Sequence, residues 1–211
     1  MPTLIELLRR SKNRNFIVCD FSPPNGGNPD LLSEASILTP DMFSVAYSPG
    51  KSVRINPVMV SHWLQNNCGI PSMFTLATRD MNKGALQGLL LGAQLLGLDN
   101  VVSVMGDDFT ETESKLQSTV KDFSPTQLIK SIKDMNQRLD FKHRFLLHPT
   151  NFCIGATIDL SRDWPREILL TKRKIDCGAD FILSQPLFNP DIPMKFLERY
   201  RETIGTPIEI P

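Results

Sequence analysis

Three polar side chains stand where apolar, strand-like runs of this sequence end. Asp20 lies in VCDFSPP, directly before two prolines that cannot continue a central strand. Asp107 follows the run VVSVMG, and Gln185 ends the run DFILSQ. A carboxyl group in an apolar setting has a raised pKa and can act as a general acid, and a second acid can stabilise a developing cation. These residue types suit a reaction that needs both, such as hydride transfer to an iminium.

Each of these residues also has a purely structural interpretation. Asp20 could cap the turn at the NGG segment that follows, and the acids of GDD at 106–108 could form a turn and a helix cap. Gln185 could bind loose backbone groups. The basic run KRK at 172–174 could be the solvated face of a helix. These alternatives stay open at the level of sequence.

The composition is that of an ordinary soluble domain. The chain has 211 residues, 41% of them hydrophobic, which allows a single domain. The formal net charge is zero, which argues against a nucleic-acid surface or a polybasic membrane arm. The most apolar stretch, 85–98, is too short to span a bilayer, and the amino terminus lacks the charge order of a signal peptide. We expect a cytoplasmic protein that binds neither nucleic acid nor membrane.

The cysteines and histidines show no metal-site or disulfide pattern. The four cysteines are widely spaced and form no CxxC pair: Cys19, Cys68, Cys153 and Cys177. We expect them to be small core residues in a reducing compartment. The three histidines lack ligand spacing, so we predict no metal site.

Strand-like and helical runs alternate along the chain. Strands are expected over 15–21, 42–47, 72–78, 100–105, part of 145–158, 180–185 and 207–210. Helices are expected over 3–13, 29–38, 56–67, 82–97, 124–139, 165–179 and 193–205. The strands are apolar throughout, as in parallel sheets buried on both faces. The alternation predicts a doubly wound sheet or a (β/α)₈ barrel, and the lack of GxGxxG after the first strand weakens the dinucleotide-binding option.

In a barrel, the polar residues at strand ends would meet in one site, because barrel active sites lie at the carboxyl ends of the strands. The other polar residues at these ends are Tyr47, Ser48, Thr78, Arg79, Asp80, Asp108, Thr157 and Asp159. The expected strands number seven rather than eight, and the final apolar run would leave two sheet edges unpaired. We therefore expect one TIM-barrel domain over 1–211, C-terminally incomplete, which is part of a longer chain or is completed by a partner subunit or a second copy.

Four segments resemble the methylenetetrahydrofolate reductase family, whose members are flavin-containing (β/α)₈ barrels. VCDFSPP resembles the first strand of the family, where an acid precedes a Pro-Pro pair. FSVAYSP and SVRINP resemble the second strand and its loop. FTLATRDMN and GALQGLLLGAQLLGLDNVVSVMGDD resemble the third strand through the Gly-Asp motif after the fourth. LLTKRKIDCGADFILSQPLF resembles the basic helix and the strand that ends in glutamine.

The resemblance implies reduction of 5,10-methylenetetrahydrofolate to 5-methyltetrahydrofolate by hydride transfer from reduced FAD, which NAD(P)H or another reductant would recharge. It makes Asp20 the general acid that opens the five-membered ring to an iminium. It places Asp107 beside the flavin and the pterin, and it lets Gln185 hydrogen-bond the folate. The family has glutamate at the position of Asp20, so the side chain here is shorter by one methylene, about 1.5 Å.

The implied flavin site departs from the family at three positions. The family often has threonine where Ala46 stands, histidine where Thr75 stands and arginine where Met105 stands. A basic helix further along would hold the ribose and phosphates of FAD. In full, the implied cofactor-binding positions are Ala46, Thr75, Met105, Gly106, Asp107, Ala156, Glu167, Arg173 and Lys174.

Two other functions fit the same residues. A non-redox paralogue would bind folate or a protein partner and hold no stable flavin. A pterin-dependent methyltransferase on the same fold would use Asp107 to bind pterin and would need no flavin.

Overall fold

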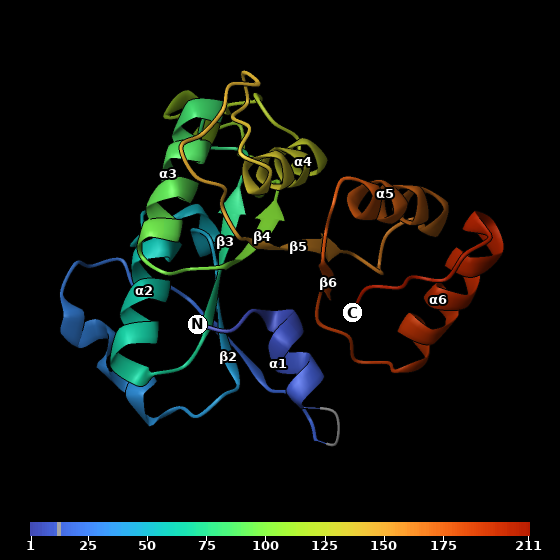
Figure 1. The fold of residues 1–211 in the computed structure, drawn as a ribbon, viewed down its shortest axis with the longest axis horizontal. Helices are drawn as coiled ribbons and strands as arrows, with labels where there is room; N and C mark the ends of the chain where they lie inside the picture. The colour runs from blue at the N-terminus through green and yellow to red at the C-terminus, as the bar shows by residue number, and fades with distance from the viewer. Residues whose placement is uncertain (12–13) are drawn as a thin grey trace.

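The computed structural model describes residues 1–11 and 14–211, and in these residues six parallel strands form one sheet in the order β1-β2-β3-β4-β5-β6. Each strand pairs with the next strand of the chain, and the sheet curls into an open, incomplete TIM barrel (Figure 1). The predicted α/β class is confirmed. The strands are Val18–Phe21 (β1), Met42–Val45 (β2), Ser72–Ala77 (β3), Asn100–Val104 (β4), Cys153–Ile158 (β5) and Phe181–Ser184 (β6).

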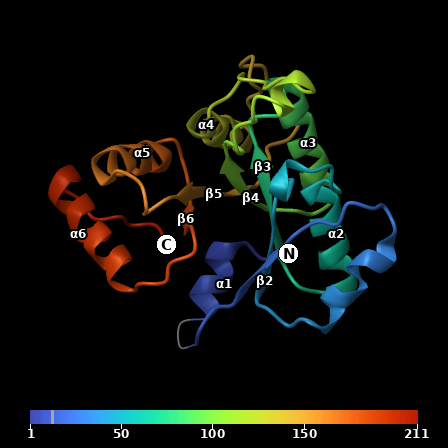
Figure 2. The same cartoon turned by 180° about the vertical axis from the view of Figure 1, so that it is seen from behind.

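Helices fill the connections between the strands. Figures 1 and 2 show α2 and α3 on one flank of the molecule and α5 and α6 on the other, with the sheet between them. The α-helices are Leu4–Arg10 (α1), Pro57–Cys68 (α2), Lys83–Leu95 (α3), Pro125–Asn136 (α4), Trp164–Asp176 (α5) and Asp191–Ile204 (α6). The 3₁₀ helices are Pro29–Ile37 (η1), Pro49–Lys51 (η2) and Glu113–Lys115 (η3).

Two predicted helices differ from the structure. The segment 29–38 forms the 3₁₀ helix η1 rather than an α-helix, and the hydroxyls of Ser33 and Ser36 donate to the carbonyl oxygens three residues earlier. Such local side-chain bonds compete with the α-helical pattern. The helix predicted over 3–13 is observed as α1, and its last two predicted residues, 12–13, lie outside the described residues.

The predicted seventh strand, 207–210, is not part of the sheet. Residues 207–211 have no regular secondary structure, and the backbone bond that ties them to β6 runs from the N–H of Ile182 to the carbonyl oxygen of Pro211, at 2.8 Å. Pro207 and Pro211 have no N–H to donate to a strand ladder. The prediction of seven strands was therefore wrong by one.

The two faces of the sheet are covered differently, because successive side chains point to opposite faces. The convex face packs against the helices, as Phe74 and Ile154 do with Leu86 of α3 and Ile129 of α4. The concave face carries a smaller cluster at its amino end, which α1 covers. Its buried members are Leu4, Met42, Met73, Val102, Cys153 and Phe181.

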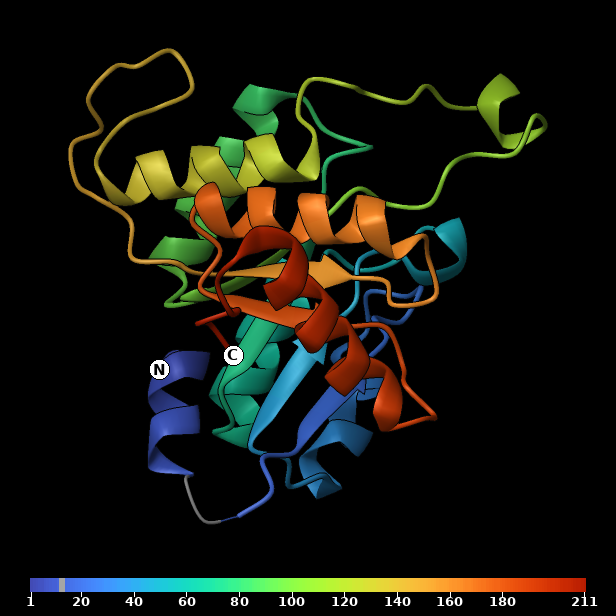
Figure 3. The same cartoon turned by 90° about the vertical axis from the view of Figure 1, so that its right-hand side faces the viewer.

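Helix α1 lies at the amino end of the sheet, opposite the long connection between β4 and α4 (Figure 3). The N–H of Leu4 donates to Oδ1 of Asn100 at 2.8 Å, at the first residue of β4. A Cβ on Gly155 would lie 2.4 Å from the Phe181 ring, so only glycine fits at this position of β5. The carboxyl end of the concave face is left open.

The prediction that the strands are buried on both faces holds for β3 and fails for β1. Val18 is 37% exposed, because the open barrel leaves the concave side of β1 uncovered. No helix in the described part of the chain is long and apolar enough to cross a membrane. The four cysteines are free thiols; Cys153 is buried and the other three are half-buried.

Candidate functional site at the carboxyl ends of the strands

Asp20 lies on the open concave face, beside Ser44 of β2. Its neighbours Cys19 and Phe21 point the other way and pack against the convex-face cluster that contains Phe43. Protein around the carboxyl group desolvates it and raises its pKa, although the side chain still meets solvent. Within the described residues the carboxylate forms no hydrogen bond, so Asp20 is not the turn cap of the structural interpretation. The carboxyl group is accessible, and its raised pKa favours the protonated form.

Arg79 organises the ends of β3 and β4. It is 7% exposed, and its Nε and Nη2 donate to the carboxylate of Asp80 at 2.6 and 2.8 Å. Its Nη1 donates to the carbonyl oxygen of Asp107 at 2.5 Å, and its guanidinium carbon lies 4.1 Å from the centre of the Phe109 ring. The guanidinium therefore connects two strand ends and holds the main chain of Asp107 in place.

Tyr47 extends this cluster to the end of β2. Burial first, and then the negative charge of Asp80, raise the pKa of Tyr47 to about 12. Hydrogen bonding by Arg79 lowers the pKa of Asp80. Tyr47, Arg79 and Asp80 were noted as polar strand-end residues but were not predicted as site residues. The signal that could have found them is the adjacent Arg79–Asp80 pair directly after a buried strand.

Gly106 lets the chain turn close to Arg79. Its φ is +87°, and a Cβ there would lie 3.3 Å from Cβ of Arg79 and 3.4 Å from Cβ of Ala77. A residue other than glycine would be strained and crowded at this position. The turn leaves Met105 52% exposed and Asp107 exposed. The described residues provide no hydrogen-bond partner for the carboxylate of Asp107, which is therefore available to a ligand.

Gln185 stands at the ends of β5 and β6. Its backbone N–H donates to the carbonyl oxygen of Ile158 at 3.0 Å and continues the pairing of the two strands. Gln185 lines a cavity of ≈ 430 Å³ together with Asp159, Ser161 and Phe188. The end of β6 therefore borders a space that a ligand can enter.

Of the three implied cofactor residues of α5, two pair with each other in the protein interior and the third lies apart. Glu167 and Lys174 are 3% and 7% exposed, and Nζ of Lys174 lies 3.5 Å from Oε1 of Glu167 and donates to the carbonyl oxygen of Thr157 at 2.5 Å. Desolvation lowers the pKa of Lys174. Arg173 is exposed on another face of α5. The solvated-face interpretation thus holds for Arg173 and fails for Lys174.

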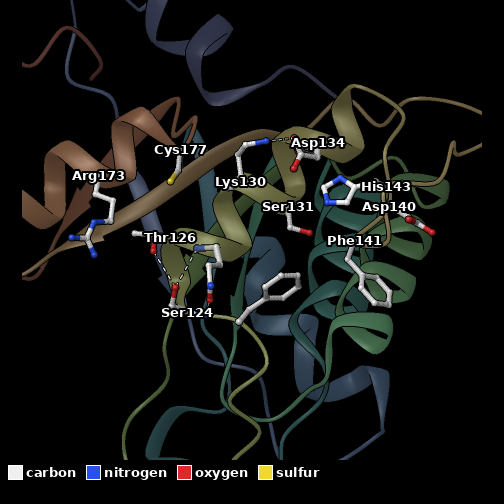
Figure 4. Close-up of a pocket in the computed structure, with 12 residues that line it drawn as sticks. Ser124, Thr126, Lys130, Ser131, Asp134, Asp140, Phe141, His143, Arg173 and Cys177 are labelled. Atoms are coloured by element: carbon white, nitrogen blue, oxygen red, sulfur yellow. Dashed lines mark hydrogen bonds and ion pairs between the residues drawn. The ribbon is translucent and has the colours of Figure 1, made fainter.

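Arg173 lines a cavity of ≈ 510 Å³ outside the barrel (Figure 4). The cavity lies between α4 and α5, and its lining includes Lys130, which pairs with Asp134. It opens among the helices that cover the convex face, whereas the polar strand ends surround the concave face. Its position separates it from Asp20 and Asp107.

The remaining implied positions divide between the two faces. Thr75 and Ala46 are half-buried on the concave side, and the N–H of Ala46 donates to the carbonyl oxygen of Phe21 at 3.0 Å. Ala156 is fully buried on the convex side, in the cluster that packs against α3 and α4. The side chain of Ala156 is therefore out of reach of a ligand on the concave face.

The residues fit a flavin ring and do not fit its nucleotide tail. Ala46, Thr75 and Gly106 are small residues on the open side of β2–β4, which suits a planar ring. The tail needs cations for its phosphates. In α5, Lys174 is already bound to protein oxygens, and Arg173 faces the groove beside α4.

Comparison with known proteins agrees with this geometry. A family model described as methylenetetrahydrofolate reductase matches residues 5–211. The curated protein methylenetetrahydrofolate reductase 2 of Schizosaccharomyces pombe is 22% identical over an alignment 212 positions long, which covers 92% of this chain and 31% of that protein. The chain thus spans less than a third of the length of this relative.

Solved structures share the fold. Phosphonopyruvate hydrolase in complex with oxalate and Mg²⁺ matches with a TM-score of 0.59 and 15% identity, over 100% of this chain and 71% of the other. A 2,3-dimethylmalate lyase matches with a TM-score of 0.56 and 12% identity, over 94% and 67%. Phosphoenolpyruvate phosphomutase from Streptomyces platensis subsp. rosaceus matches with a TM-score of 0.55 and 16% identity, over 92% and 69%. At these identities the likeness concerns the fold alone.

Proposed function

The chain belongs to the methylenetetrahydrofolate reductase family, and we propose that it reduces 5,10-methylenetetrahydrofolate to 5-methyltetrahydrofolate with FAD as cofactor. The observation that carries the proposal is Asp20, an accessible carboxyl group with a raised pKa at the carboxyl end of the first strand. Asp107 and Gln185 at the ends of later strands support it. Residues 1–211 act together as one barrel domain.

The proton chemistry belongs to Asp20. In its protonated form it donates a proton to the ring nitrogen of the substrate, the adjacent carbon–nitrogen bond breaks, and an iminium cation forms. The carboxylate of Asp107, free of protein partners among the described residues, stabilises this cation electrostatically. The amide of Gln185 hydrogen-bonds the folate and orients it.

FAD in its reduced form would supply the hydride that converts the iminium to the methyl group, and NAD(P)H or another reductant would recharge it. Ala46, Thr75 and Gly106 would hold the ring, while Met105 stands exposed beside it. A cytoplasmic setting, which keeps thiols reduced, suits the four free cysteines.

The direct test is product formation by variants of Asp20. The chain is mixed without oxygen with chemically reduced FAD and 5,10-methylenetetrahydrofolate, and 5-methyltetrahydrofolate is separated and measured. We expect Asp20→Asn to lower the rate by about 10²–10⁴-fold, the usual contribution of a general acid. Asp20→Glu restores the longer family side chain and should match or exceed the wild-type rate.

Asp163→Asn is the matched control, because the Asp163 side chain makes no cap hydrogen bond. It should leave the rate unchanged. Absence of 5-methyltetrahydrofolate from both the wild type and Asp20→Glu would contradict the proposal.

A second candidate, folate binding without redox turnover, is favoured by the arrangement of α5. Lys174 and Glu167 bind each other instead of standing free for a phosphate group. This candidate predicts that the chain binds 5-methyltetrahydrofolate and binds none of the flavins. Binding of FAD detected by quenching of its fluorescence would exclude it.

A further inference from the structure

Two cations hold consecutive carbonyl oxygens in the connection that follows β4. Arg79, after β3, donates to the carbonyl oxygen of Asp107 at 2.5 Å. Lys51, after β2, donates through Nζ to the carbonyl oxygen of Asp108 at 2.8 Å. The main chain at the turn is thus fixed from two neighbouring strand ends. We name Arg79, Lys51 and their acidic partners, Asp80 and Glu113, the carbonyl clamp.

Each cation of the clamp is anchored by a carboxylate of its own. Asp80 binds the fork of Arg79, and Oε2 of Glu113 accepts from Nζ of Lys51 at 3.0 Å. The same oxygen of Glu113 accepts from the N–H and the hydroxyl of Thr110 at 2.7 and 2.9 Å. The charges of the clamp are therefore compensated within it, and the carboxylate of Asp107 is not needed for charge balance.

The connection is also tied at its far end. The N–H of Val120 donates to the carbonyl oxygen of Arg79 at 2.7 Å. Arg79 therefore binds both ends of the long connection between β4 and α4, which Figure 3 shows. Ser48 and Lys51 adopt left-handed φ values of 39° and 56°, which are unfavourable for residues other than glycine. Such strain persists where the surrounding contacts require it, and here it places Nζ of Lys51 at the connection.

We propose that Arg79 and Lys51 are positioning residues, which hold the main chain of residues 107 and 108 so that the Asp107 carboxylate faces the N–H groups or positive charge of a bound pterin. The inference rests on the proposed function for the identity of the ligand. The clamp itself is a feature of the protein alone.

The test is a double-mutant cycle with 5-methyltetrahydrofolate as the probe, measured by titration calorimetry. Lys51→Met should weaken binding by about ten- to a hundredfold, since a misplacement of about 1 Å has effects of this size. In an Asp107→Asn background the same change should alter binding by less than about twofold. Lys51 is inferred to act through the Asp107 carboxylate, so its effect should disappear when that carboxylate is absent. Lys115→Met is the matched control, since Lys115 lies in the same connection and pairs with Glu111 at the surface.

Arg79→Lys keeps the charge but loses the fork and should give the same pattern as Lys51→Met. Equal weakening by Lys51→Met in both backgrounds, or none in either, would overturn the inference.

Hydrogen exchange separates this failure from failure of the proposed function. Amides of 105–113 should exchange faster in Lys51→Met than in Lys115→Met, with no ligand present. Faster exchange together with no binding of the probe by the wild type would reject the pterin ligand and the positioning role, and would leave the clamp as a structural feature. Unchanged exchange would reject the clamp directly.

Discussion

The carbonyl clamp and helix α5 use the same residue types in opposite ways. In the clamp, Arg79 and Lys51 bind main-chain carbonyl oxygens beside Asp107 and leave its carboxylate free among the described residues. In α5, Lys174 binds the carboxylate of Glu167 itself, and both are buried. The carboxylate of Asp107 is free because the cations near it pair with other carboxylates, whereas Lys174 pairs with Glu167 itself.

The comparison also separates two parts of the flavin site. The strand ends of β2–β4 offer an open surface with a free acid, whereas α5 offers no free cation from its buried face. We therefore expect the chain to recognise the ring of a flavin and not its nucleotide tail. Variants in either region test this difference.

The largest effect is expected when the α5 pair is broken. Lys174→Met leaves the carboxylate of Glu167 buried without its cation, which should lower the free energy of unfolding by about 3–5 kcal/mol. The double variant Lys174→Met with Glu167→Leu removes both charges and should recover most of this loss. Urea unfolding measures both. Lys172→Met, at an exposed pair with Asp176, is the control and should cost at most about 1 kcal/mol. A loss below that of the control would show that the pair is not buried in solution.

The affinities of the flavins test whether Lys174 is free to bind a phosphate. Lys174 is buried and bonded to Glu167 and to the carbonyl oxygen of Thr157, so it offers no charge to a phosphate. Riboflavin, FMN and FAD should therefore bind within about tenfold of one another, since a charge-assisted phosphate contact would add roughly a factor of ten or more. Flavin fluorescence titrations give the three affinities, and a preference for FAD well above tenfold would contradict this account of α5.

Lowering the pH distinguishes the clamp from Asp20, because the pKa values of Glu113 and Asp20 shift in opposite directions. Hydrogen bonds from Thr110 and Lys51 lower the pKa of Glu113 from 4.5 to about 2. Its contribution to stability is present above the unfolded value and is lost as the pH falls toward 2. Burial raises the pKa of Asp20, so its contribution falls as the pH rises through the folded value.

Two variants test the directions of these two pKa shifts. Asp20→Asn should unfold at a higher urea concentration than the wild type at pH 7, whereas Glu113→Gln should unfold at a lower one. Repeating the measurement near pH 2.5 should shrink both differences. A destabilised Asp20→Asn at pH 7 would show that the carboxylate is not desolvated.

The smallest effect is expected at Thr171. Its hydroxyl is buried in α5 and has no hydrogen-bond partner among the described residues. Thr171 is on the same face as Glu167 and Lys174, four residues after one and three before the other. Thr171→Val replaces the hydroxyl with a methyl group of similar shape and should be neutral or stabilising, by at most about 1 kcal/mol. A clear loss in thermal unfolding would indicate that the hydroxyl has a partner in solution.

Much of the fold follows from the sequence, because strand-like runs and helix caps are local signals. The helices predicted from 56 and 124 are observed as α2 and α4, each with a capping residue followed by proline, Asn56–Pro57 and Ser124–Pro125. The segment 207–210 was wrongly predicted as a strand. An apolar run is not sufficient for a strand where prolines remove the N–H donors that would pair with the neighbouring strand.

The sequence predicted which residues of the candidate site lie at strand ends. It predicted less well in which direction their side chains point. Asp20 and Gln185 lie at carboxyl ends, as strand order requires. The side chain of Ala156 lies on the convex face because residues alternate along β5, whereas its neighbours Gly155 and Thr157 are on the concave side. The different directions of Arg173 and Lys174 in α5 could have been predicted from their spacing, since neighbouring helix positions point about 100° apart.

The most direct test of the proposed function is the visible absorbance of FAD in the presence of this chain. FAD is reduced chemically without oxygen, 5,10-methylenetetrahydrofolate is added, and the oxidised-flavin spectrum is followed with and without the protein. The account predicts that the spectrum returns only with the protein, with one 5-methyltetrahydrofolate formed for each flavin reoxidised. A spectrum that stays bleached in the presence of the protein would contradict it.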